Sequence, residues 1–128
     1  MSMSQRIVAG FVDPQGDEDD EEGEIIGSGF EVRRLGNPGT FDIVFNQPFR
    51  EAPSVVASQV YPVNPETDLM INTLANVIIL GISKFKFRLT VGAPNGRPVS
   101  RAFTFVAIGK WGTPPSPTKL LKCLKEDG

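Results

Sequence analysis

The sequence has no histidine and only one cysteine, and these absences exclude several classes of active site. Without histidine the chain cannot form a Ser-His-Asp triad, a Cys-His nucleophile pair or a histidine-rich metal site. The lone Cys123 excludes an intrachain disulfide, which fits synthesis in a reducing cytoplasm. Because Cys123 has lysines but no base beside it, we interpret it as an unreactive thiol.

Long apolar runs are missing too. No stretch approaches the roughly 20 apolar residues that a membrane-spanning helix needs, and no basic segment followed by an apolar one stands at the N-terminus. We therefore expect neither membrane insertion nor a signal peptide. Phosphate-binding glycine loops and zinc-type cysteine spacings are also absent, so no motif indicates an enzyme or a cofactor.

Charge is unevenly distributed along the chain. The formal net charge is −2, but seven of the 15 acidic residues lie between Asp17 and Glu24, and the rest of the chain carries +5. The basic residues are dispersed, so we expect no nucleic-acid partner. The acidic run predicts a solvated loop over residues 13–23. Asp17, Asp19 and Asp20 are candidate ligands for Ca²⁺, but they lack the spacing of an EF-hand, and mutual repulsion in an unstructured loop is the favoured interpretation.

Alternation of apolar and polar residues predicts β-strands. The clearest case is residues 84–91 (KFKFRLTV), whose four apolar residues, Phe85 among them, share one side. Residues 40–45 alternate in the same way. In residues 102–108 both sides become apolar towards the end, which favours a central strand or one packed against a second subunit. The weaker strand candidates are residues 6–11, 30–35, 54–61 and 76–82.

Seven such strands, with no convincing amphipathic helix among them, predict an all-β fold, an antiparallel β-sandwich of six to seven strands over residues 1–112. Gly and Pro mark a tight turn at residues 36–39 and a longer hairpin loop at residues 92–98. Residues 113–128 form a Pro-rich spacer and a short C-terminal tail with leucines at helical spacing. We interpret this tail as either a docking segment for a neighbouring chain or a frayed end.

Aromatic rings and planar hydrogen-bond donors are the groups that sugar sites and protein interfaces use. Four residues of this kind are candidate ligand contacts: Tyr61, Asn95, Arg97 and Trp111. Each could equally be an ordinary loop or edge residue.

Three blocks of sequence together resemble the H-type lectin family. In residues 44–56 (VFNQPFREAPSVV) a strand ends in Phe, a Pro-aromatic pair follows, and a proline introduces the next aliphatic strand. Residues 84–87 and 98–109 look like the last two strands of that family. The resemblance covers roughly residues 6–111. It implies a six- or seven-stranded antiparallel sandwich that assembles as a trimer, with ligand sites at the rim between protomers.

Residues 26–34 and 41–45 also look like a module of phage tail-fibre and bacterial surface proteins. Two departures from the H-type pattern concern the sugar site. Phe105 stands where these lectins carry a Trp, and residues 92–97 (GAPNGR) stand where the family places an aromatic and polar sugar-binding group. The sugar-contacting His and the N-terminal linking Cys have no counterpart. The resemblance therefore concerns the scaffold more than the galactose-type site.

Two functions from different classes fit these observations. The first is a non-enzymatic trimeric recognition or attachment module of the fibre-tip or lectin type, which binds a cell-surface glycan or protein. The alternative is a structural virion or assembly protein that docks through the acidic loop and the C-terminal tail without binding sugar. In both we expect a protein that is made in the cytoplasm and acts on a virion or an extracellular surface.

Overall fold

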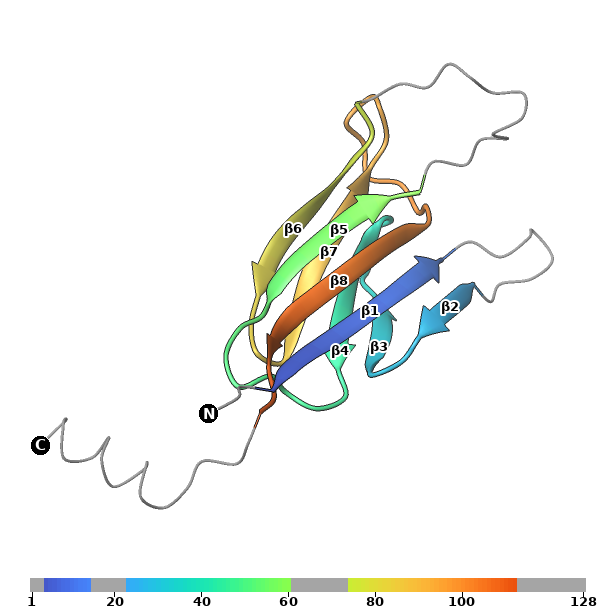
Figure 1. Ribbon diagram of the computed structural model, residues 1–128. Helices are drawn as coiled ribbons and strands as arrows, with labels where there is room; N and C mark the ends of the chain where they lie inside the picture. The colour runs from blue at the N-terminus through green and yellow to red at the C-terminus, as the bar shows by residue number, and fades with distance from the viewer. Residues whose placement is uncertain (1–3, 15–22, 61–73, 113–128) are drawn as a thin grey trace, which may run out of the picture.

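Figure 1 shows the computed structural model of the chain, which describes residues 4–14, 23–60 and 74–112. In these residues the chain forms eight strands and no helix, arranged as a sandwich of two four-stranded antiparallel sheets. None of the described segments is a helix that could cross a membrane. The strands are β1 (Gln5–Asp13), β2 (Glu24–Gly27), β3 (Phe30–Arg34), β4 (Thr40–Phe45), β5 (Ser54–Gln59), β6 (Asn76–Ile82), β7 (Lys86–Gly92) and β8 (Phe103–Lys110).

The strand order is β2-β1-β8-β5 in one sheet and β3-β4-β7-β6 in the other; we name them the β1/β8 sheet and the β4/β7 sheet after their central strands. β8 lies between β1 and β5, which is the first of the two positions predicted for residues 102–108. The edge strands β5 and β6 are neighbours on one side of the sandwich (Figure 1). There the Gln59 amide donates to the carbonyls of Asn76 and Gly92 at 3.0 and 2.9 Å, and so ties the two sheets together.

Phenylalanine rings from both sheets fill the space between them. The Phe105 ring of the β1/β8 sheet lies 4.9 Å from that of Phe30 and 5.2 Å from that of Phe87, both in edge-to-face geometry. Such pairs add about 0.5–1.5 kcal/mol to the stabilisation that burial alone provides. The buried apolar residues of this core are Val8, Val12, Phe30, Phe41, Ile43, Phe45, Phe49, Phe87, Leu89, Val91, Phe103, Phe105 and Ala107.

The structure has one strand more than the six to seven predicted. β2 has only four residues, all of them exposed, and it pairs with the end of β1, where Ile26 lies opposite Phe11. Gly27 and Gly29, with φ of 119° and 92°, turn the chain from β2 into β3 of the other sheet. A strand this short shows too little alternation to be recognised in the sequence.

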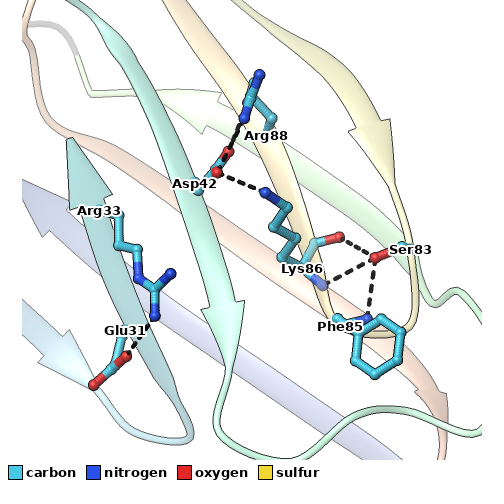
Figure 2. Close-up of polar contacts among 7 residues, drawn as sticks. All are labelled: Glu31, Arg33, Asp42, Ser83, Phe85, Lys86 and Arg88. Atoms are coloured by element: carbon cyan, nitrogen blue, oxygen red, sulfur yellow. Dashed lines mark hydrogen bonds and ion pairs between the residues drawn. The ribbon is translucent and has the colours of Figure 1, made fainter. Parts of the chain in front are cut away.

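The prediction that Phe85 shares a buried face with Phe87 is wrong. Phe85 is 55% exposed and precedes β7, which begins at Lys86. The hydroxyl of Ser83 accepts the backbone N–H groups of Phe85 and Lys86 at 3.1 and 3.2 Å, and this turn joins β6 to β7 (Figure 2). The turn takes Phe85 out of the alternation that continues from Phe87 along the strand.

Candidate functional site

The outer face of the β4/β7 sheet carries an ion-pair cluster centred on Asp42. The Asp42 carboxylate accepts hydrogen bonds from Arg88 Nε at 2.7 Å and from Lys86 Nζ at 2.9 Å, both across the β4–β7 pair (Figure 2). Its side chain is 6% exposed, whereas the two basic side chains are nearly half exposed. Two cations thus share one carboxylate, and the cluster keeps one positive charge in excess.

These contacts change the acidity of Asp42. The hydrogen bond from Arg88 is the largest cause, and together with the hydrogen bond and charge of Lys86 it lowers the pKa of Asp42 to about 2, against the smaller opposing effect of burial. The same pair raises the pKa of Arg88. Asp42 therefore stays ionised in the folded protein at a pH at which it would be protonated in the unfolded chain.

Replacing Asp42 with asparagine should lower the free energy of unfolding at pH 7 by about 2 kcal/mol. Because the folded pKa lies below the unfolded value of about 3.9, the carboxylate stabilises the fold above that value and loses this effect as the pH falls towards 2. Urea unfolding at pH 7, 4 and 2.5 should show the wild-type and Asp42→Asn stabilities converging. Glu31→Gln is the control, since Glu31 pairs with Arg33 only at 3.7 Å on the exposed surface and should contribute less than about 0.5 kcal/mol. Parallel pH profiles of Asp42→Asn and wild type would contradict this role of the cluster.

A depression of about 290 Å³ lies beside the cluster, between the end of β6 and the start of β7. Its lining includes the apolar residues Leu80, Ile82 and Phe87 and the basic residues Lys86 and Arg88. The structure therefore places an apolar hollow next to an excess positive charge.

The outer face of the β1/β8 sheet is different in character. Registry brings Ile7 opposite Ile108, Ala9 opposite Val106 and Val106 opposite Val56, so these outward side chains meet across three strands. We call this surface the apolar face. Its residues are Ile7, Ala9, Phe11, Ile26, Val56, Val106 and Ile108.

In the part of the chain that the structure describes, charged residues lie only at the two ends of the apolar face. Lys110 lies opposite Gln5 at one end, and Asp13 lies opposite Glu24 at the other. With strands about 4.8 Å apart and same-face residues about 7 Å apart, these seven apolar positions cover roughly 240 Å². The uncharged polar residues Thr104, Ser54 and Ser58 occupy neighbouring positions of the same face on β8 and β5. This area approaches the lower end of the range for the largest apolar patch on a typical monomer, about 300–600 Å², and such patches are often functional.

The candidate ligand residues do not form a common site in the described part of the chain. Asn95 and Arg97 lie in the loop that follows β7, where the Asn95 side chain accepts the Arg97 backbone N–H at 3.0 Å. Trp111 follows the other end of β8, an eight-residue strand about 23 Å long. Tyr61 lies outside the described residues. The loop at residues 92–98 folds back on itself as predicted, and Val99 N–H donates to the Val91 carbonyl at 2.9 Å. The chain then enters β8 of the other sheet, so the prediction that this loop joins two paired strands of a hairpin is wrong.

Trp111 helps to close one end of the sandwich. The Arg6 guanidinium lies 4.6 Å from the centre of the Phe49 ring and 5.0 Å from that of Trp111, and it donates to the Gln47 carbonyl at 2.6 Å. Burial lowers the pKa of Arg6. Trp111 is nevertheless 46% exposed, so much of this residue remains accessible to solvent.

The metal-site candidates Asp17, Asp19 and Asp20 lie outside the described residues, and Ca²⁺ binding stays a prediction. Within residues 4–14, 23–60 and 74–112, no three His, Cys, Asp or Glu side chains group as metal ligands. The tail at 113–128, with Cys123, also lies outside the described residues.

Sequence reasoning missed both the apolar face and the hollow beside β6. The signal for the face was present in residues 102–108, where both sides of the strand are apolar, and in Ile7 and Val56 on other strands. The signal for the hollow was a glycine, Gly81, inside an otherwise aliphatic strand.

Comparison of the chain with family models, with curated proteins and with solved structures found no match. The resemblance to H-type lectins stays a prediction.

Proposed function

We propose that the chain is a non-enzymatic, self-assembling module whose copies associate through the apolar face. The observation that carries this proposal is a contiguous set of mostly exposed apolar side chains across all four strands of one sheet, with charge, among the described residues, only at its ends. An uncharged apolar centre with a polar rim is the usual anatomy of a protein interface. Roughly 240 Å² would form the apolar centre of a standard interface of about 800 Å² per partner, with the neighbouring Ser and Thr residues in its polar surround.

A trimer is the stoichiometry that we propose, on the basis of the H-type lectin resemblance and the outward apolar residues of β8. In such an assembly the module would serve attachment on a virion or an extracellular surface. Recognition of a cell-surface glycan or protein would profit from three linked sites, since avidity multiplies a weak affinity per site. Glycan binding itself stays a prediction, because Trp111 lies far from Asn95 and Arg97 and these residues do not converge on one pocket.

Val56→Glu tests the proposed interface. Val56 is 71% exposed, so the substitution should leave the monomer fold intact, but in an assembly it would bury a charge without a partner. We expect sedimentation velocity to show a single oligomer for the wild type at micromolar concentration, and association at least tenfold weaker for the variant. The sedimentation coefficient of the wild type gives the number of subunits.

Ile78→Glu is the matched control for this experiment. Ile78 is 50% exposed and lies on the outer face of the other sheet, so the same change there should leave association unaltered. A wild type that stays monomeric at tens of micromolar would overturn the proposal. So would a Val56→Glu variant that associates as the wild type does.

A further inference from the structure

β6 is an edge strand that lacks the charged residues and prolines that often protect such edges, although a bulge at Leu80 interrupts it and β5 of the other sheet lies beside it. Among the described strands it pairs only with β7, and its seven residues include no charged residue and no proline. The opposite edge of the same sheet, β3, carries Glu31, Arg33 and Arg34. Natural sheets use charges and prolines to keep foreign strands from pairing with an edge. Within the described residues, one edge of the β4/β7 sheet is therefore protected by charge, and the other has no such protection beyond its Asn76 end, where Gln59 bonds to it.

Gly81 leaves a gap in the row of side chains along β6, and we call this gap the notch. It pairs with Arg88 of β7, just after an irregularity in register at Leu80, and a β-carbon built on it would meet no atom within 4 Å. Gly81, Lys86 and Arg88 all line the same hollow, so the missing side chain adds space beside the two basic residues. Gly81 is not one of the glycines with positive φ, so its backbone does not require a glycine. The lack of a side chain leaves the basic cluster accessible across the edge strand.

The charge of the cluster indicates what would enter the notch. Lys86 and Arg88 share the single carboxylate of Asp42, and both remain nearly half exposed. A second carboxylate would balance the excess charge. Arginine also has spare N–H donors for it, because the guanidinium has five and only two are used towards Asp42.

We propose that β6 takes up an extended acidic segment of a partner protein as an added strand, with one carboxylate of that segment passing over Gly81 to Lys86 and Arg88. Backbone hydrogen bonds to the free edge supply affinity in this mode of recognition, and side-chain pockets supply specificity. Apolar side chains on either side of the carboxylate would pack on Leu80 and Ile82, which are 52% and 39% exposed. This site lies on the sheet opposite the apolar face and does not depend on self-association.

The probes are two fluorescently labelled nine-residue peptides of alternating Thr and Val, one with Glu and one with Lys at the central position. Fluorescence anisotropy should show binding of the Glu peptide to the wild-type protein and binding at least tenfold weaker for the Lys peptide. Gly81→Val, which fills the notch with a residue that suits a strand, should weaken binding of the Glu peptide at least tenfold. Gly36→Val is the matched control, since Gly36 also has open space around its β-carbon position but lies in the β3–β4 turn.

Hydrogen exchange gives a second readout that is specific for strand addition. The amides of residues 76–82 should gain protection when the Glu peptide is bound, and those of β3 should not. No binding at millimolar peptide, equal binding of the two peptides, or unchanged binding by Gly81→Val would each overturn the proposal. A change in sedimentation on Gly81→Val without peptide binding would mean that β6 pairs with a second copy, which also overturns it.

Discussion

Replacing Phe105 with alanine should lower the free energy of unfolding by about 4 kcal/mol, as is typical for removal of a fully buried aromatic ring. Phe105 is 2% exposed and makes edge-to-face contacts with Phe30 and Phe87 at 4.9 and 5.2 Å. The substitution removes the ring from the centre of the core, where both sheets contribute, and the cavity cannot collapse without moving a strand. Because small domains are stable by only about 5–15 kcal/mol, the variant should lose a large part of its stability.

Phe85→Ala is the control, measured in the same urea unfolding experiment. In the sequence Phe85 and Phe105 look alike, since each is a Phe within a Phe-x-Phe alternation. Phe85 is 55% exposed in the β6–β7 turn, so its loss should cost less than about 1 kcal/mol. Equal effects of the two substitutions would show that the burial of the two rings is not as described.

Alternation predicted most of the strands because the sandwich buries only one face of each sheet. The strands around Phe41 and Phe87 follow this rule, and their inward residues are almost completely buried. Phe85 is an exception to this rule, because the alternating pattern of β7 extends back into the turn that precedes the strand. Only the hydrogen bonds of Ser83 show that the strand begins after Phe85. A pattern of side chains reports which residues are apolar, and the point at which a strand gives way to a turn depends on backbone hydrogen bonds that the pattern does not contain.

The candidate sites were harder to predict than the strands. Ile7, Val56 and Val106 come from three segments far apart in the sequence, and only the strand order β2-β1-β8-β5 brings them onto one surface. Pairing order between distant strands follows from the packing of the whole core and not from any local signal. In the same way, the alternation in residues 40–45 predicts only that Asp42 faces outward, and the register of β4 against β7 is needed to place it opposite Arg88.

The alanine variant of Gly39 should lose about 3 kcal/mol, the sum of a strained backbone and a steric conflict. Gly39 has a φ of 76°, which costs an alanine about 1–2 kcal/mol. Its β-carbon would also lie 2.6 Å from the backbone nitrogen of Val99 and 2.8 Å from its carbonyl oxygen. If Val99 moved, the hydrogen bond that its N–H donates to the Val91 carbonyl, at 2.9 Å, would be disturbed. The hydrogen bond from Val91 N–H to the Gly39 carbonyl, at 2.8 Å, would be disturbed with it.

Gly96→Ala separates the two contributions to the effect at Gly39. Gly96 has a similar φ of 87°, but a β-carbon there would meet no atom within 4 Å. The substitution should therefore cost only the backbone part, about 1 kcal/mol, and the difference between the two variants in urea unfolding measures the close approach of the β3–β4 turn to Val99. If the two variants lose the same stability, the approach of Val99 contributes nothing. A larger loss for Gly39→Ala instead means that the loop after β7 is held against this turn by backbone contacts that admit only glycine.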